Sequence, residues 1–218
     1  MKIEHKTKKE LVYTILKDLV IEGKWRPGER KTFIQISELL NVSRTPVAEA
    51  CKMLEYDGWI IIKPQVGVEA VSPTKKEITE DYKIRAVLEG LAGAEAIPNL
   101  KNKDFEVLEQ KLTKMIKTEA KDDFSEFYKI NRSFHEHIYK ASNMVQLVKT
   151  LDYFWDCAMM YQAYYKHLPN VLVDSNNHHR KILSNLKSKD ANLTRSSLQK
   201  DSLDFGQKLT HYLENIEI

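Results

Sequence analysis

The chain has 218 residues, of which 42% are hydrophobic and 30% are charged. This length predicts one large domain or two small ones, with enough apolar residues for a proper core. No run approaches the ~18 consecutive apolar residues of a transmembrane helix, and no apolar signal core follows the N-terminal lysines. We therefore expect a cytoplasmic protein that does not enter a membrane. Cys51 and Cys157 are isolated, which is typical of buried thiols in a reducing compartment.

The charge is unevenly distributed along the chain. The formal net charge is +3. Residues 1–76 carry 14 Lys and Arg against 10 Asp and Glu, whereas residues 77–218 carry 20 against 21. The basic excess therefore lies in the N-terminal third. It is compatible with a polyanionic partner but too small to establish one.

The first third of the chain predicts three short helices and a hairpin. Apolar residues at helical spacing predict helices over 7–23 and 33–40. Ser43 can cap a third helix, with Pro46 in its first turn, where the missing N–H costs nothing. Residues 59–71, "WIIIKPQVGVEAV", are rich in β-branched residues around a Pro- and Gly-containing middle. This pattern predicts a small hairpin, or wing.

A boundary follows the wing. Ser72 and Pro73 break the strand pattern, and Thr74 with Glu77 makes a capping box. No strand pattern occurs beyond this point. Six helical segments are predicted, over 75–97, 102–120, 123–142, 144–167, 170–187 and 190–214. The predicted fold is mainly α, with a winged helix-turn-helix DNA-binding domain over 1–73 and an all-helical bundle over 74–218.

The N-terminal domain indicates DNA binding. In a helix-turn-helix, residues at the N-terminus of the second helix meet base edges in the major groove. Arg44 can hold a guanine or a phosphate there, and the helix N-terminus itself attracts phosphate. Taken singly, each residue could equally be a helix cap or a solvated charge, so the prediction rests on their combination. The candidate DNA-binding residues are Ser43, Arg44 and Thr45 in the helix, and Lys63, Gln65 and Gly67 in the wing.

The bundle contains polar residues at core-facing positions. Asn131 and His135 are four apart and share a helix face. The spacing of the leucines around His179 turns that histidine toward the core, while His178 is the more outward of the two. Asp201 lies on the apolar side of the last helix. Spacing alone leaves open whether these helices converge on a metal site or each residue is separately hydrogen-bonded in the core.

The stretch "IEGKWRPGER…ISELLNVSRTPVAEACKMLEYDGWIIIKPQVGVEAV" resembles the winged helix-turn-helix of GntR-family bacterial transcription regulators over roughly residues 10–71. The "PGER", "VSRTPV" and "LE-x-DGW" elements carry the resemblance. One position departs from it, because Ala48 stands where the family usually has a DNA-contacting Arg. The resemblance implies a regulator bound to a double-stranded operator, in which Arg44 takes a larger share of base recognition. Because one recognition helix reads only a few base pairs, we also expect a homodimer on a pseudo-palindrome.

Residues 78–213 resemble the FCD domain, the helical effector-binding domain of one GntR branch. "DYKIRAVLEGLAGAEA", "FHEHIYKASN" and "HHRKILSNLKSKDA" carry this resemblance. It implies a divalent metal (Zn, Ni, Mn or Fe) bound by Asn131, His135, His179 and Asp201, where Asp201 replaces the usual His and Asn131 the commoner Asp. It also implies that Arg85 faces an effector pocket, where it could clamp a carboxylate. Alternatively, Arg85 forms a surface pair with Glu89.

These patterns lead to one expectation and two alternatives. We expect a DNA-binding regulator, a repressor, controlled by a small organic acid through a bound metal. The first alternative is a regulator whose bundle binds an apolar or acyl ligand without metal. The second is an enzyme that uses two histidines and one carboxylate around a metal. No nucleophile–base pair, phosphate-binding loop or catalytic residue supports that enzyme.

Overall fold

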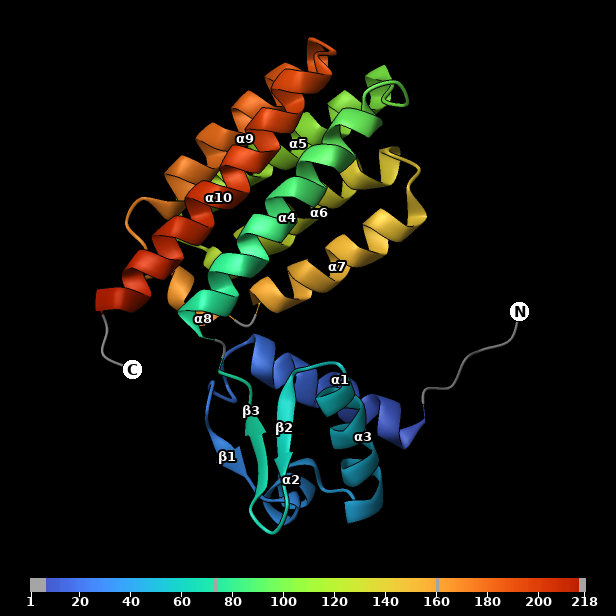
Figure 1. Ribbon diagram of the computed structural model, residues 1–218, viewed down its shortest axis with the longest axis vertical. Helices are drawn as coiled ribbons and strands as arrows, with labels where there is room; N and C mark the ends of the chain where they lie inside the picture. Colours follow the sequence, from blue (N-terminus) through green and yellow to red (C-terminus); the bar gives the residue numbers. More distant parts are fainter. Residues whose placement is uncertain (1–6, 73, 160, 216–218) are drawn as a thin grey trace. The chain divides into compact units, whose positions relative to one another are not determined.

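The computed structural model describes residues 7–72, 74–159 and 161–215 (Figure 1). The chain divides into two compact units, one of residues 1–73 with 159–163 and the other of residues 74–158 with 164–218. They are called the N-terminal unit and the helical unit below. None of the described helices is long and apolar enough to cross a membrane.

The N-terminal unit combines helices with a small antiparallel sheet of order β1-β3-β2. The predicted wing is present, since β2 pairs with β3 so that Ile60 faces Ala70 and Ile62 faces Val68. A third strand, β1, was not predicted, because two residues are too short to show a pattern in the sequence. The elements are α1 (Lys8–Ile21), β1 (Arg30–Lys31), α2 (Phe33–Leu40), α3 (Arg44–Tyr56), β2 (Ile60–Lys63) and β3 (Gly67–Ala70).

The turn before α3 is built from local conformational preferences. Asn41 ends α2 in the left-handed conformation, with φ of 50°, which Asn tolerates better than most residues. Ser43 occupies the N-cap position of α3, but its side chain makes no capping hydrogen bond. The predicted cap is therefore wrong in its chemistry, and the Ser43 hydroxyl, on an exposed residue, is left available for another partner.

The helical unit is a bundle of long helices, and no strand occurs among its described residues. Thr74 and Glu77 form the predicted capping box at the start of α4. The predicted helix over 144–167 is instead two helices; Met160 lies outside the described residues. The helices that follow β3 along the chain are α4 (Lys75–Ala96), α5 (Asn102–Glu119), α6 (Phe124–Ala141), α7 (Val145–Met159), α8 (Gln162–Tyr165), α9 (Val171–Lys187) and α10 (Ala191–Asn215); the end of α7 and the start of α8 fall in the N-terminal unit.

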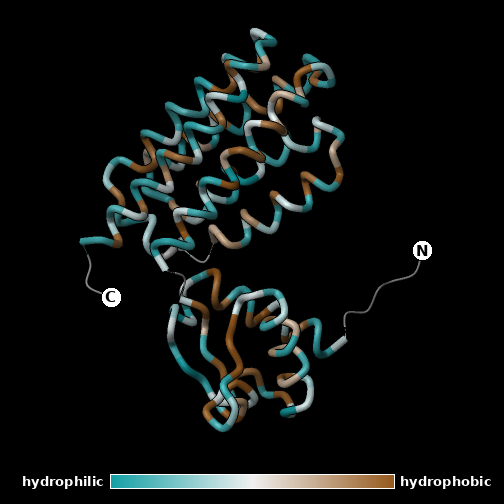
Figure 2. The backbone as a smooth tube through the Cα atoms, viewed as in Figure 1, coloured by the Kyte–Doolittle hydropathy of each residue, from teal (hydrophilic) through white to brown (hydrophobic). Residues whose placement is uncertain are grey.

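Helices α4 and α10 lie side by side in the bundle at unusually close approach (Figure 1). A Cβ atom on Gly93 would lie 2.1 Å from Leu198 Cδ1, and one on Gly206 would lie 2.5 Å from Tyr82 Cβ. Glycine at these positions lets the two backbones approach. Hydrophobic and hydrophilic residues are interspersed along the bundle helices (Figure 2), and α5, α6 and α9 each have one apolar face for the core. Helices α6, α9 and α10 thereby present a few polar side chains to that core.

Candidate DNA-binding surface and metal centre

The candidate DNA-binding residues of α3 lie together at its start. Ser43, Arg44 and Thr45 are all exposed, while Val47, Ala50 and Leu54 of the same helix are buried. Among the described residues, Arg44 has no hydrogen-bond or ion-pair partner. One face of α3 is therefore fixed in the core, and the N-terminal turn presents polar side chains to solvent.

The tip of the wing is a tight turn, and positively charged side chains lie at the foot of the wing. The Val66 N–H donates to the Lys63 carbonyl at 3.0 Å, and Gln65 between them has φ of 63° and is exposed. Lys63 lies 2.7 Å from Glu69, which also pairs with Arg30 at 2.6 Å. Two cations share one carboxylate, so the foot of the wing keeps a net positive charge.

Gly67 has a structural role that the sequence did not show. It is buried, has φ of 128°, and a Cβ there would lie 2.5 Å from the Lys31 carbonyl oxygen. The contact between β1 and β3 therefore requires glycine at this position. The predicted approach to DNA by its backbone stays a prediction.

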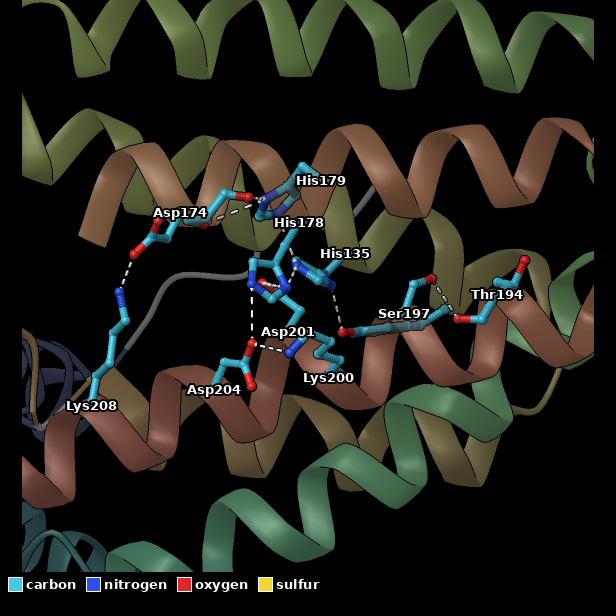
Figure 3. A network of polar contacts seen from close by, with 12 residues as sticks. His135, Asp174, His178, His179, Thr194, Ser197, Lys200, Asp201, Asp204 and Lys208 are labelled. Carbon is cyan, nitrogen blue, oxygen red and sulfur yellow. Dashed lines mark hydrogen bonds and ion pairs between the residues drawn. The ribbon is translucent and has the colours of Figure 1, made fainter. Parts of the chain in front are cut away.

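In the helical unit, three of the four predicted metal ligands come together from three helices. His135 of α6, His179 of α9 and Asp201 of α10 point toward one another (Figure 3). The His135 Nε2 atom lies 3.0 Å from His179 Nε2 and 3.3 Å from Asp201 Oδ2. One donor atom from each of the three lies within 4.8 Å of the others. Both histidines are fully buried.

Hydrogen bonds behind the rings decide which nitrogen faces the cluster. His179 Nδ1 lies 2.5 Å from the Ser175 carbonyl oxygen. Because a carbonyl only accepts, Nδ1 carries the proton and Nε2 keeps its lone pair. His135 Nδ1 lies 2.9 Å from the Tyr139 hydroxyl, which can donate or accept. His135 can therefore hold a proton on Nε2 between His179 and Asp201, or donate from Nδ1 to Tyr139 and offer Nε2 to a cation.

Both His179 and Asp201 are held in their deprotonated forms. Burial lowers the pKa of His179 to about 4, against the opposing effect of Asp201. Burial would raise the pKa of Asp201, but the hydrogen bond with His135 and the neighbouring His179 lower it to about 2. At pH 7 the cluster thus contains a neutral imidazole and a carboxylate, the forms in which these groups bind metals.

Two of the three donor–donor separations in the cluster fit one divalent cation. Two atoms each bound ~2.1 Å from one ion lie about 3.0 Å apart at a right angle and about 3.4 Å apart at the tetrahedral angle. The two separations from His135 Nε2, 3.0 Å to His179 and 3.3 Å to Asp201, fall in this interval. Two imidazoles and one carboxylate suit Zn²⁺, Mn²⁺, Ni²⁺ or Fe²⁺ and leave coordination positions open.

The fourth predicted ligand, Asn131, lies one helical turn before His135 on α6. It is 8% exposed, and its Oδ1 atom has no hydrogen-bond partner among the described residues. A buried carbonyl-type oxygen without a partner costs free energy unless a cation, a ligand or water supplies one. This orphaned oxygen supports the predicted role of Asn131 in ligation.

Arg85 is a buried residue. Its Nε atom lies 2.7 Å from Glu89 Oε1, and the two residues are 6% and 0% exposed. The predicted pairing with Glu89 is thus present, but it is not on the surface. The guanidinium also lies 4.0 Å from the centre of the Trp155 ring, which is 5.2 Å from the His135 ring. Burial would lower the pKa of Arg85, but the Glu89 carboxylate, together with Tyr82 and Tyr139, raises it above its ordinary value.

Two contacts around the cluster were missed from the sequence. Tyr139 follows His135 by four residues, so its position behind that ring could have been found from helical spacing. Asp204 follows Asp201 by three and contacts His178, with Oδ2 3.3 Å from Nε2. His178 was placed outward, and its side chain is 20% exposed. Its contact with Asp204 depends on how α9 and α10 pack, which spacing does not give.

In a comparison with known proteins, the chain matches two domain families, one after the other along the sequence. Residues 8–69 match the bacterial regulatory proteins of the gntR family, and residues 80–200 match the FCD domain. The first segment runs from the start of α1 into β3, and the second contains His135 and His179.

Two relatives match across most of their length. The HTH-type transcriptional regulator YdhC of Bacillus subtilis, itself uncharacterized, is 28% identical over 93% of this chain and 91% of its own length. The HTH-type transcriptional regulator McbR of Escherichia coli is 30% identical over 71% of this chain and 70% of its own. The solved structure of McbR superposes with a TM-score of 0.81 over 96% of this chain and all of that one, at 26% identity. The relatives are transcription regulators rather than enzymes, and this chain belongs to the GntR family of bacterial transcription regulators, in the branch whose C-terminal domain is an FCD domain.

Proposed function

We propose that the protein is a homodimeric repressor whose helical unit binds a divalent metal and a small organic acid. The observation that carries this proposal is the convergence of His135, His179 and Asp201 in a buried cluster with deprotonated donors. When bound, the metal would supply open coordination positions for a carboxylate. The cytoplasm, where a bacterial operator lies, is the proposed location.

On the DNA side, the first turn of α3 would enter the major groove and the wing would contact an adjacent phosphate or the minor groove. Support comes from the exposed, unpaired Arg44 and from the net positive charge at the foot of the wing. One recognition helix reads only a few base pairs. Two copies on a pseudo-palindrome would gain both affinity and specificity, which is the reason to propose a dimer.

On the effector side, two buried polar atoms of α6 favour a polar ligand over an acyl chain. The Asn131 Oδ1 atom and the Tyr128 hydroxyl lack hydrogen-bond partners among the described residues. A hydroxyl or carboxyl group could pair with either, whereas a methylene chain would leave both unpaired at a cost of about 1–3 kcal/mol each. Arg85, balanced by Glu89, would contribute a donor rather than a free positive charge.

Binding of the acid would change DNA affinity only if it prefers one arrangement of the two DNA-binding units over another. The test has two steps. Duplexes selected from a random pool by the wild-type protein should share a pseudo-palindrome. A panel of small hydroxy and dicarboxylic acids should then raise the melting temperature of the metal-loaded protein and weaken its binding to the selected duplex. Stabilisation by fatty acids alone, with or without metal, would favour the acyl alternative and contradict this proposal.

A further inference from the structure

The Asp201 carboxylate faces two environments. Its Oδ2 atom lies 3.3 Å from His135 Nε2, inside the cluster, and its Oδ1 atom lies 3.9 Å from His178 Nδ1. The His135 side chain is 0% exposed, whereas that of Asp201 is 12% exposed. Asp201 also lines a groove of about 760 Å³ between α9 and α10. Of the three clustered residues, it is the one through which the cluster meets that groove.

A second pair of metal-binding side chains lies further out along the same groove. His178 Nε2 is 3.3 Å from Asp204 Oδ2, and their side chains are 20% and 36% exposed. The outward sequence is therefore His135 and His179, then Asp201, then His178 and Asp204 (Figure 3). Lys200 lies 2.8 Å from Asp204 Oδ2 and is 68% exposed. Its ammonium occupies the oxygen that an incoming cation would use first.

The groove carries an excess of negative charge. A cleft lined mainly by one sign of charge concentrates ions of the opposite sign and raises their association rates. The two ammonium groups of Lys200 and Lys208 pair with carboxylates of the groove, and two carboxylates remain in excess. The lining carboxylates are those of Asp174, Asp201, Asp204 and Glu214.

We propose that this groove is the loading route of the inner metal site, and that His178 and Asp204 form an outer position at which the cation first binds. The proposal rests on the proposed inner site of His135, His179 and Asp201. The cation passes from the outer position to Oδ1 of Asp201 and then to the inner donors, while Lys200 competes for Asp204. On this route the cation does not have to reach the two buried histidines directly from solvent.

Substituting a residue on the loading route should change the rates of metal association and dissociation without changing the dissociation constant. Asp204→Asn weakens the outer position, which every cation crosses in both directions. Association and dissociation should therefore slow together, by roughly tenfold, with the dissociation constant unchanged within about twofold. Lys200→Gln should accelerate both. A residue that only supports the inner site would change the dissociation constant instead.

Trp155 provides the readout, because its ring lies 5.2 Å from the His135 ring and a paramagnetic Co²⁺ ion bound there quenches its fluorescence. The experiment mixes metal-free full-length protein with Co²⁺ at neutral pH in a stopped-flow instrument. Release is followed after addition of excess chelator. Asp174→Asn is the matched control, since it removes one carboxylate from the same groove but pairs with Lys208 rather than with His178 or Asp201.

Loading and release that slow in Asp204→Asn well beyond any slowing in Asp174→Asn, which removes the same charge but no outer donor, are the expected result. Wild-type rates in Asp204→Asn overturn the route. A larger dissociation constant at an unchanged association rate also overturns the route, because Asp204 would then stabilise the bound metal. Absence of Co²⁺ quenching and binding in the wild type overturns the proposed inner site itself, and that failure is distinct from a failure of the route.

Discussion

Removing the hydroxyl of Tyr139 tests how the protein positions His135 to bind a metal. Tyr139→Phe removes the 2.9 Å hydrogen bond to His135 Nδ1 while keeping the ring. Tyr139 is 1% exposed, so bulk water cannot take the place of the hydroxyl. Loss of the group behind a ligating histidine typically weakens metal affinity by about 10–100-fold, which is about 1.4–2.7 kcal/mol. We expect a loss in this range.

The assay is a competition titration of metal-free protein against a chromophoric chelator for Co²⁺. Tyr128→Phe is the matched control, because Tyr128 lies on the same helix, is 5% exposed, and has a hydroxyl without a hydrogen-bond partner among the described residues. Its affinity should stay within about twofold of wild type. Equal affinities in both variants, or equal losses, would refute the role given to the Tyr139 hydroxyl.

Three further predictions concern DNA binding, pH and packing. Arg44→Ala should weaken binding to the selected duplex by roughly 1–3 kcal/mol; an unchanged affinity in a gel-shift titration would remove Arg44 from base recognition. Burial lowers the pKa of His179 to about 4 from 6.5, so as pH falls the unfolded chain takes up this proton first. The unfolding free energy of metal-free protein should therefore fall as pH drops through that interval, by about 3 kcal/mol between pH 7.5 and pH 4. A urea-unfolding series in which His179→Gln shows the same decline as wild type would contradict this assignment. Gly93→Ala places a Cβ 2.1 Å from Leu198 Cδ1 and should destabilise the helical unit by about 1–3 kcal/mol; a wild-type urea midpoint would show that α10 adjusts freely.

Much of the fold could be predicted because its signals are local. Thr74 and Glu77 mark the start of α4 by a capping box, and that box is present. The hairpin around Pro64 was predicted from its β-branched flanks and its turn residues. The extra strand β1 was not predicted, because two residues are too short to show a pattern, and neither was the end of α7 at Met159.

The candidate site could be predicted only in part. Helical periodicity predicted that His179 faces the core, and the structure confirms that it is fully buried. Periodicity describes one helix at a time, so the approach of Asp201 on α10 to His135 on α6 came from the family resemblance alone. The same limit hid the buried setting of the Arg85–Glu89 pair, which a single helix cannot distinguish from a surface pair at the same spacing.

The most direct test of the proposed metal site is the metal content of protein purified without chelators or a histidine tag, measured by mass spectrometry. Asp201→Asn is the matched variant, because it keeps the shape of the side chain and removes the charge that faces His135 and His179. About one divalent metal per wild-type chain, lost in Asp201→Asn, is the predicted result. No metal in the wild type, even after incubation with Zn²⁺, Ni²⁺ and Mn²⁺, would mean that the cluster is a hydrogen-bonded core network, and would contradict the proposed control by metal.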